Sequence, residues 1–294
     1  MTDADTLQRF LFERSGVRGE LVRLSATWQA VCARQAYPPA IGRVLGEMMA
    51  AAALLAATLK FQGALVMQIQ GSGPLRLLVV ECTAGLALRA TAKWAGEPKG
   101  DFAQLLGEGR FAITLDPRDG RPAYQGIVAV EGGSVAKALE HYMARSEQLP
   151  TRLVLTAEGG VAAGLLLQQL PRSAASDPLP EADAWDRLRN LAATLSPGEL
   201  ARLPFREILR RLFSEEDVRL FDPEPVHFAC SCSRTKVADM LRLLGQEEVT
   251  GILAEQGQVT VTCEFCNQRY EFDAVDVAQL FASPLSTPAG SHCH

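Results

Sequence analysis

The sequence predicts an α+β protein with three parts: an N-terminal domain of mixed strands and helices, a helical linker and a small cysteine-bearing C-terminal domain. Short strand patterns separated by turns dominate the first 170 residues, with few helices among them. Prolines and small polar residues interrupt this pattern from position 171. Four of the seven cysteines lie close together near the end. We place the domains at 1–172, 173–225 and 226–283, with a flexible tail over 284–294.

The composition is that of a globular protein. The chain has 294 residues and a mass of 31.8 kDa, with 48% hydrophobic and 21% charged residues. The formal charge of −5 lacks the basic excess of an electrostatic nucleic-acid binder, so we expect no specific nucleic acid partner. The N-terminus shows no signal peptide, and the most apolar stretch, 48–59, is too short to span a bilayer. We therefore expect a cytoplasmic protein with no membrane partner.

Apolar periodicity and turn residues define the elements expected in the N-terminal domain. The tetrapeptide Gly-Ser-Gly-Pro at 71–74 joins two apolar runs and predicts a β-hairpin. Pro38 and Pro39 open a helix that should reach residue 59, because its apolar residues follow helical spacing. The expected strands span 17–24, 65–70, 75–80, 86–94, 110–115 and 124–130, with a last pair at 153–157 and 165–170. A second helix is expected over 134–145.

The linker should contain amphipathic helices. Ser196 and Glu199 have the spacing of a capping box, with Pro197 at the first helical position. Apolar residues recur at helical spacing on either side of it, and such a stripe needs a partner surface. The first set is Trp185, Leu188, Leu191 and Leu195, and the second is Phe205, Ile208, Leu209, Leu212 and Phe213.

The C-terminal domain is expected to combine three helices with two strands. Ser233 should cap a helix that ends at Leu244 before Gly245, and Asp273 should cap a closing helix to Phe281. A short helix fits 247–255, and strands fit 259–263 and 269–272. Fewer than 60 residues make a small core, and a domain of this size usually needs an additional cross-link.

The cysteine spacing supplies that cross-link. Cys230 and Cys232 form a C-x-C pair, Cys263 and Cys266 form a C-x-x-C pair, and 30 residues separate the two pairs. Two close thiolate pairs brought together by a folded segment suit the tetrahedral coordination of zinc, so we expect a four-cysteine zinc domain. The alternative is four reduced cysteines in a core. A C-x-C disulfide closes a small, strained ring that is easily reduced, which favours a reversible switch over a permanent bridge.

Other candidate sites are weaker. His227 lies three residues before Cys230 and is the alternative fourth ligand, but is otherwise a surface or strand histidine. We expect His141 at the surface, Cys32 and Cys82 buried as small apolar residues, and His292-Cys293-His294 in the flexible tail. No Ser/His/Asp arrangement or carboxylate pair stands out, so we expect a protein that is not an enzyme.

At its cysteines the chain resembles the heat-shock protein 33 family, the redox-regulated holdase chaperones of the bacterial cytoplasm. The resemblance extends from about residue 5 to 282. One departure is Asn267, where the family pattern has Gly after the last cysteine, although Asn also tolerates a left-handed conformation. Segments outside the cysteines also resemble the family: 11–13, 17–22, 58–61, 70–74, 124–126, 145–152 and 253–255.

The resemblance implies ATP-independent binding of unfolding and oxidatively damaged clients after a stress-induced oxidation. It implies that Cys230, Cys232, Cys263 and Cys266 hold one zinc ion per chain in the reduced state. On oxidation it implies bonds Cys230–Cys232 and Cys263–Cys266, zinc release and homodimers.

The linker helices are the candidate client surface. Loss of zinc would unfold a domain with so small a core, and the amphipathic helices could then be released. The residues that would be exposed are Trp185, Phe205, Ile208, Leu212 and Phe213. The alternative is that these helices form an ordinary packed subdomain.

Two other functions remain open from the residues alone: a thiol–disulfide oxidoreductase that uses Cys263-x-x-Cys266, and a zinc-dependent RNA-binding module.

Overall fold

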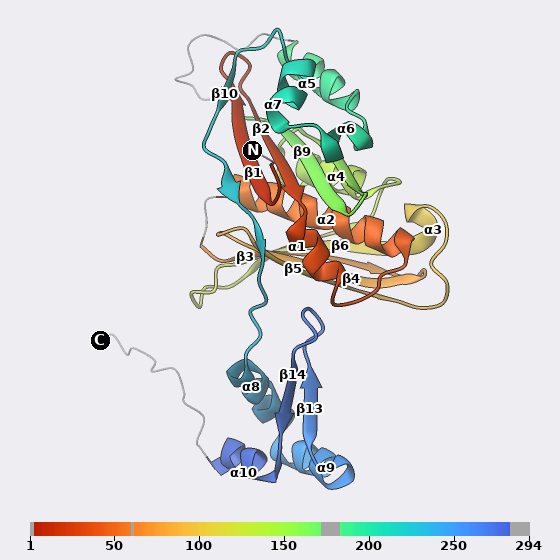
Figure 1. The fold of residues 1–294 in the computed structure, drawn as a ribbon, viewed down its shortest axis with the longest axis vertical. Helices are drawn as coiled ribbons and strands as arrows, with labels where there is room; N and C mark the ends of the chain where they lie inside the picture. The colour runs from red at the N-terminus through yellow and green to blue at the C-terminus, as the bar shows by residue number, and fades with distance from the viewer. Residues whose placement is uncertain (1–2, 60–61, 172–182, 283–294) are drawn as a thin grey trace, which may run out of the picture. The chain divides into compact units, whose positions relative to one another are not determined.

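The chain folds into two compact units. The computed structural model describes residues 3–59, 62–171 and 183–282. The contacts divide the chain into Met1–Ala229 and Cys230–His294 (Figure 1). The described helices of the expected linker, 173–225, therefore belong to the first unit. The stretch 172–182, which includes most of the proline-rich segment, and the expected tail at 284–294 lie outside the described residues.

The first unit contains these helices and strands. Its strands are β1 (Thr6–Phe12), β2 (Val17–Leu24), β3 (Ala64–Gly71), β4 (Leu75–Thr83), β5 (Ala87–Trp94), β6 (Gly109–Asp116), β7 (Tyr124–Ala129), β8 (Thr151–Glu158), β9 (Val161–Gln169), β10 (Val218–Leu220), β11 (Glu224–Pro225) and β12 (His227–Phe228). Its helices are α1 (Ala26–Cys32), α2 (Pro39–Thr58), α3 (Phe102–Leu106), α4 (Val135–Arg145), α5 (Ala184–Ala193), α6 (Pro197–Arg202) and α7 (Phe205–Leu212).

Two six-stranded sheets organise the first unit. The first sheet has the order β10-β1-β2-β9-β8, with β11 also paired to β1, and its strands are antiparallel. The second has the order β12-β5-β4-β3-β6-β7. Its hairpin β3–β4 confirms the turn predicted at 71–74, and β8–β9 confirms the last strand pair. The chain segment 224–228 pairs with both sheets, through β11 on β1 and through β12, in parallel, on β5.

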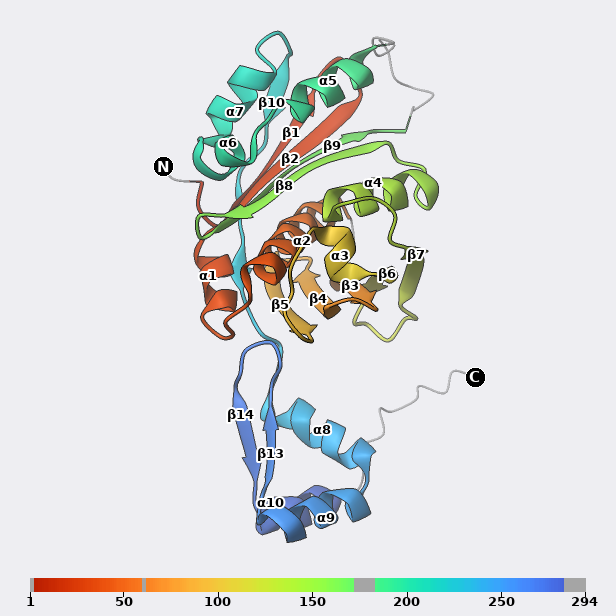
Figure 2. The same ribbon diagram turned by 90° about the vertical axis from the view of Figure 1, so that its right-hand side faces the viewer.

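Helix α2 packs between the two sheets (Figure 2). By length and composition alone, its 20 residues are apolar enough to cross a membrane. The apolar stretch 48–59 noted in the sequence has only 12 residues because it covers mainly the second half of this helix. The helix is nevertheless a core helix, as predicted, because 72% of its most apolar window is buried in the protein. Small residues let the layers meet closely. A Cβ on Gly46 would lie 2.5 Å from the Cβ of Ala157 on β8, which explains the glycine.

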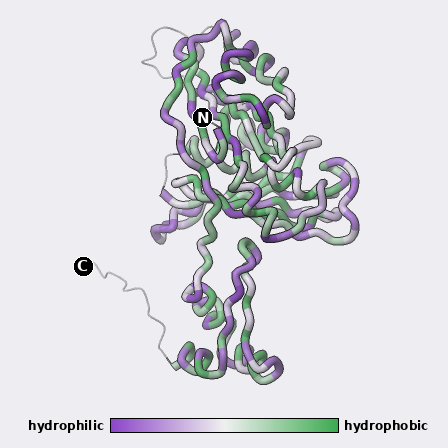
Figure 3. The backbone as a smooth tube through the Cα atoms, viewed as in Figure 1, coloured by the Kyte–Doolittle hydropathy of each residue, from purple (hydrophilic) through white to green (hydrophobic). Residues whose placement is uncertain are grey.

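The helices α5–α7 cover the other face of the first sheet. In Figure 3 their residues alternate between hydrophilic and hydrophobic, as expected of amphipathic helices. Phe213 packs edge-on against Phe12 with 4.9 Å between ring centroids, and Phe10 lies beside both. The predicted capping box is present, with the Ser196 hydroxyl accepting from the Glu199 N–H. Both faces of β2 and β9 are therefore covered, which explains why these strands are buried almost throughout.

The second unit matches the predicted order of elements. It contains α8 (Arg234–Leu244), α9 (Gln246–Gln256), the hairpin β13 (Val259–Thr262) and β14 (Arg269–Phe272), and α10 (Ala274–Ala282). Ser233 caps α8 through the Lys236 N–H, and the Asp273 carboxylate accepts from the Asp276 N–H. The buried core is small, as predicted: Val237, Leu241, Val249, Val259, Phe272, Val277 and Leu280.

Candidate metal centre

Two local structures position the four cysteines. Cys230 and Cys232 lie in the extended segment just before the cap of α8. Cys263 and Cys266 occupy the turn of the β13–β14 hairpin, where the Cys263 N–H donates to Gln268 O at 2.9 Å and the Asn267 N–H to Cys263 O at 2.8 Å. Asn267 has φ 57°, the left-handed conformation that asparagine tolerates.

The four sulfurs form one compact cluster. All four Sγ atoms lie within 4.8 Å of one another, and none of these cysteines is in a disulfide. The Sγ atoms of Cys230 and Cys263 are 3.7 Å apart, and those of Cys232 and Cys266 are 3.3 Å apart. A tetrahedron with Zn–S bonds of about 2.3 Å has sulfur separations of about 3.8 Å. The donor set and its spacing therefore fit a tetrahedral, soft metal ion such as zinc.

Partial burial raises the pKa of two thiols of the cluster. Burial raises the pKa of the Cys263 thiol and also that of the Cys266 thiol. The Tyr270 hydroxyl lies 3.1 Å from the Cys232 Sγ, and this hydrogen bond is the main reason that the pKa of Tyr270 rises to about 12. Without a metal, Cys263 and Cys266 therefore stay protonated at neutral pH, whereas a bound divalent cation would favour thiolates.

Besides the cysteines, Arg234 connects the start of α8 to the hairpin and to α10. Arg234 donates to Glu271 O and pairs with Asp276, both at 2.7 Å, and its guanidinium lies 4.3 Å from the Phe272 ring centroid. Arg234 and Tyr270 were not identified from the sequence. Their only signals there are an arginine directly after the Ser233 cap and an aromatic hydroxyl four residues after Cys266.

The remaining predicted residues lie away from the cluster or outside the description. His227 is exposed in β12 and is not in the cysteine cluster, and His141 is an exposed residue of α4, as predicted. Cys82 is buried, as expected. The prediction for Cys32 is wrong: the residue is exposed, because α1 buries Trp28 and Val31 and leaves its last residue outside. His292-Cys293-His294 lies outside the described residues.

The residues predicted to form the client-binding surface are buried or partly buried in this structure. Phe205, Ile208 and Phe213 are each at most 2% exposed, and Trp185 and Leu212 pack at the edge of the same cluster. They cover the first sheet together with Leu188, Leu200 and Leu209. An apolar surface made by these residues would have to be created by movement of α5–α7.

Comparison with known proteins agrees with this architecture. The family model described as Hsp33 protein matches residues 5–273. The chain belongs to the Hsp33 family. The family resemblance inferred from the sequence is therefore confirmed, together with the α+β fold and its cysteine-bearing C-terminal domain.

Individual relatives match nearly the whole chain. The 33 kDa chaperonin of Methylobacillus flagellatus is 51% identical over 297 residues, covering 100% of both chains. That of Chromobacterium violaceum is 53% identical over 284 residues, covering 96% of this chain and 95% of the relative. The crystal structure of a 33 kDa chaperonin from Thermotoga maritima superposes with a TM-score of 0.82 at 23% identity, covering 95% and 98% of the two chains, and supports the fold.

Proposed function

We propose that this Hsp33-family chain is a redox-regulated, ATP-independent holdase of the cytoplasm that keeps unfolding and oxidatively damaged proteins from aggregating. Its partners would be unfolded client proteins, and it would not be an enzyme. The supporting observation is the cluster of four cysteines, none of them in a disulfide, in a unit with a small core, within a chain whose relatives are chaperonins.

In the reduced state, Cys230, Cys232, Cys263 and Cys266 would hold one zinc ion per chain. Bound zinc supplies a positive charge that keeps the four sulfurs as thiolates and links the start of α8 to the hairpin turn. Structural zinc sites contribute roughly 10–16 kcal/mol of apparent binding free energy, which is comparable to the roughly 5–15 kcal/mol stability of a whole domain. The second unit would therefore depend on the cysteines for its fold.

Oxidation would convert the cluster into two disulfides, paired as the family resemblance implies: Cys230 with Cys232 and Cys263 with Cys266. In each pair two thiolates lose two electrons as the S–S bond forms, and one hydrogen peroxide takes up these electrons with two protons from solvent to give two waters. Disulfide sulfurs are poor ligands, so the cysteines would no longer retain the zinc ion. The strained C-x-C ring would make the change reversible by cellular thiols.

Unfolding of the second unit would then release α5–α7. The residues now buried against the first sheet, Phe205, Ile208 and Phe213, would join Trp185 and Leu212 in an exposed apolar surface for clients. The same surface would favour a homodimer of the oxidised chain. No specific nucleic acid or membrane partner is part of this proposal.

The test compares reduced and peroxide-treated protein at mildly elevated temperature, without ATP, for suppression of aggregation of an unfolding client. We expect about one zinc ion per reduced chain, loss of zinc and four thiols on oxidation, and activity in the oxidised form alone. Cys32→Ser is the matched control, because Cys32 is a free cysteine outside the cluster. Equal activity of the reduced form would contradict redox control.

The same preparations test the two other functions open from the sequence. Cys263-x-x-Cys266 lies in a hairpin turn rather than at a helix N-terminus, where reactive C-x-x-C motifs have their lowered pKa. Turnover of a model disulfide substrate would assign an oxidoreductase instead of a holdase. A salt-dependent gel shift with RNA would assign the RNA-binding module.

A further inference from the structure

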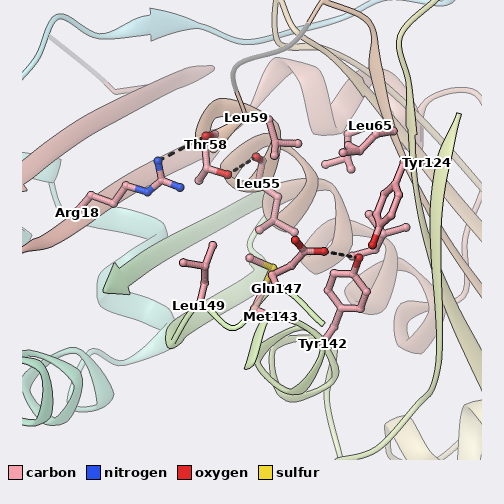
Figure 4. Close-up of a pocket in the computed structure, with 12 residues that line it drawn as sticks. Arg18, Leu55, Thr58, Leu59, Leu65, Tyr124, Tyr142, Met143, Glu147 and Leu149 are labelled. Carbon is pink, nitrogen blue, oxygen red and sulfur yellow. Dashed lines mark hydrogen bonds between the residues drawn. The ribbon is translucent and has the colours of Figure 1, made fainter. Parts of the chain in front are cut away.

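A pocket in the first unit is lined by residues that are far in sequence from the four-cysteine cluster. It has a volume of about 220 Å³ and lies beside the C-terminal end of α2 (Figure 4). Arg18, Thr58, Tyr124 and Glu147 each reach it from one of the separate segments that resemble the family in sequence. The four-cysteine switch uses none of these residues.

The walls of the pocket are mainly apolar. An apolar protein cavity of about 150 Å³ is large enough to bind benzene, so this pocket suits a body somewhat larger than a benzene ring. Five of the twelve lining residues are polar, and mainly apolar walls with a few placed polar groups are typical of a site that takes a small molecule with an apolar body and a polar head. The apolar lining residues are Leu55, Leu59, Leu65, Ile113, Leu115, Met143 and Leu149.

Arg18 places a positive charge at one side of the pocket. Its guanidinium donates to the Gln168 Oε1 and, at 3.5 Å, to Thr58 O, and both acceptors are neutral. No carboxylate forms an ion pair with Arg18 within residues 3–59, 62–171 and 183–282. Burial lowers the pKa of Arg18 and outweighs the opposing effect of Glu20, which means that the charge of Arg18 is incompletely solvated.

The acid nearest in sequence to Arg18 does not supply a full counter-charge. Glu20 follows two residues later on the same face of β2, but it is only 2% exposed. Burial raises the pKa of Glu20 to about 8, so that this carboxyl is largely protonated at neutral pH. A ligand carboxylate could therefore provide the ionic partner that Arg18 lacks, using guanidinium N–H groups not engaged by Gln168 or Thr58.

The opposite side of the pocket carries the groups that would orient such a ligand. In Figure 4, Tyr124, Tyr142 and Glu147 lie across the pocket from Arg18, with Leu55, Met143 and Leu149 between the two sides. The Tyr142 hydroxyl donates to a Glu147 carboxylate oxygen at 2.9 Å. The negative charge of Glu147 disfavours a second carboxylate on its side, so an anionic head is directed toward Arg18.

We propose that this pocket binds a small amphipathic monocarboxylate, such as a fatty acid of about eight carbons, with its carboxylate on Arg18 and its chain among Leu59, Met143 and Leu149. This site is separate from the client surface and is formed in the reduced protein. It would give the first unit a ligand of its own, independent of the cysteine switch.

Calorimetric titration of the reduced, zinc-loaded chain tests the proposal with three probes of equal length: octanoate, 1-octanol and octylamine. We expect octanoate to bind with one site per chain, at least about tenfold more tightly than the other two, since only a carboxylate forms charge-assisted hydrogen bonds with the Arg18 guanidinium. No binding of octanoate would overturn the proposal. Uptake of several molecules per chain, or equal binding of octanol, would overturn it too, because both indicate adsorption to apolar surface in general.

Two variants locate the site. Arg18→Gln should weaken octanoate binding about tenfold or more and leave octanol binding unchanged, whereas Arg76→Gln, a change at an exposed arginine of β4, should alter neither. Leu149→Trp fills the pocket and should abolish octanoate binding while keeping Arg18. Circular dichroism and zinc content verify that each variant is folded. Unchanged octanoate affinity in folded Leu149→Trp would show that the ligand binds elsewhere and that the proposal is wrong.

Discussion

Glu20 is a buried carboxyl at the junction of the strands β1, β2 and β11. Glu20 on β2 pairs in register with Arg9 on β1, and Glu224 on β11 forms an ion pair with the same arginine. In the described part of the chain, the Glu20 Oε2 has no hydrogen-bond partner. Burial is the main cause of the raised pKa of Glu20, opposed by Arg18 and Arg9, and Glu224 raises it further.

This residue makes the stability of the first unit depend on pH. The pKa of Glu20 rises from an ordinary 4.5 to about 8 in the folded state, so the folded chain binds this proton more tightly than the unfolded chain. The sign is opposite to that of a salt-bridged carboxylate. Ionisation of Glu20 does not destabilise the first unit below about pH 4.5, and the destabilisation grows until about pH 8, reaching at most a few kcal/mol. We expect Glu20→Gln to remove this component and to stabilise the first unit most at pH 8.

Urea unfolding between pH 5 and pH 8 measures the effect. Tryptophan fluorescence reports on the first unit alone, because Trp28, Trp94 and Trp185 all lie there. Glu108→Gln, at an exposed acid of the same unit, is the control and should leave the pH dependence unchanged. An identical pH dependence in wild type and Glu20→Gln would contradict the prediction.

Tyr270 should strengthen metal binding without being a ligand. Its hydroxyl donates to the Cys232 sulfur, and groups that hydrogen-bond to metal ligands typically change metal affinity by about 10–100-fold. We expect Tyr270→Phe to weaken zinc binding by about tenfold, measured by competition with a chromogenic chelator, with the fold retained. Tyr37→Phe in the first unit should bind zinc like the wild type. Wild-type affinity in Tyr270→Phe would show that this hydrogen bond does not stabilise the metal site.

Among the helices and strands, the sequence predicted those with a clear local pattern and missed β1, α1 and the shortest strands of the first unit. Apolar periodicity identified α2, α4 and the β3–β4 hairpin because each is long enough to show its period. The strands β10, β11 and β12 have two or three residues and form only by pairing with β1 and β5. Segments this short have no local sequence pattern from which a strand can be predicted.

Helix α3 could have been found from sequence. Asp101 accepts from the Gln104 N–H and the Gln104 side chain accepts from the Asp101 N–H, a capping box with visible spacing. The cysteine cluster was predictable because ligand spacing is local within each pair. The contact of Tyr270, the exposure of Cys32 and the pocket at Arg18 depend on tertiary packing, which the spacing of residues does not encode.

The packing of α5–α7 should control how easily the client surface is exposed. Phe213 fills the space beside Phe10 and Phe12, and replacing a buried Phe by Ala typically costs about 3–5 kcal/mol. We expect reduced Phe213→Ala to keep its zinc and to suppress client aggregation partly, with faster amide exchange over 184–212. Arg206→Ala, at an exposed position on α7, is the matched control. Faster exchange without any gain in activity would exclude these helices as the client surface.

In the whole chain, the cysteine cluster either stabilises only its own unit or also restrains the helices α5–α7 of the first unit. We expect Cys263→Ser to lose zinc, unfold 230–282, increase amide exchange over 184–212 and give partial holdase activity under reducing conditions. The loss of a site worth roughly 10–16 kcal/mol exceeds what so small a core can absorb. The first unit should stay folded, because it has its own extensive core.

Hydrogen exchange read by mass spectrometry separates the two possibilities, with Cys32→Ser as the matched cysteine control. If 230–282 exchanges freely in Cys263→Ser while 184–212 exchanges as in the wild type, the two units are not coupled. The cysteines would then stabilise only their own unit, and the proposed mechanism of activation would be wrong even though the family assignment stands.

The segment that pairs with both sheets has a mechanical consequence. Residues 224–228 hold the first sheet through two residue pairs of β11 and the second through two residue pairs of β12, and the chain then continues directly into Cys230. A pulling force applied at the C-terminal end, by optical tweezers or by a translocating protease, therefore loads these four residue pairs, and the bond from the Ala229 N–H to Leu88 O, before any other part of the first unit. The sheets would be peeled in short steps, β12, then β11, then the three pairs of β10, before the force reaches the layer formed by α2.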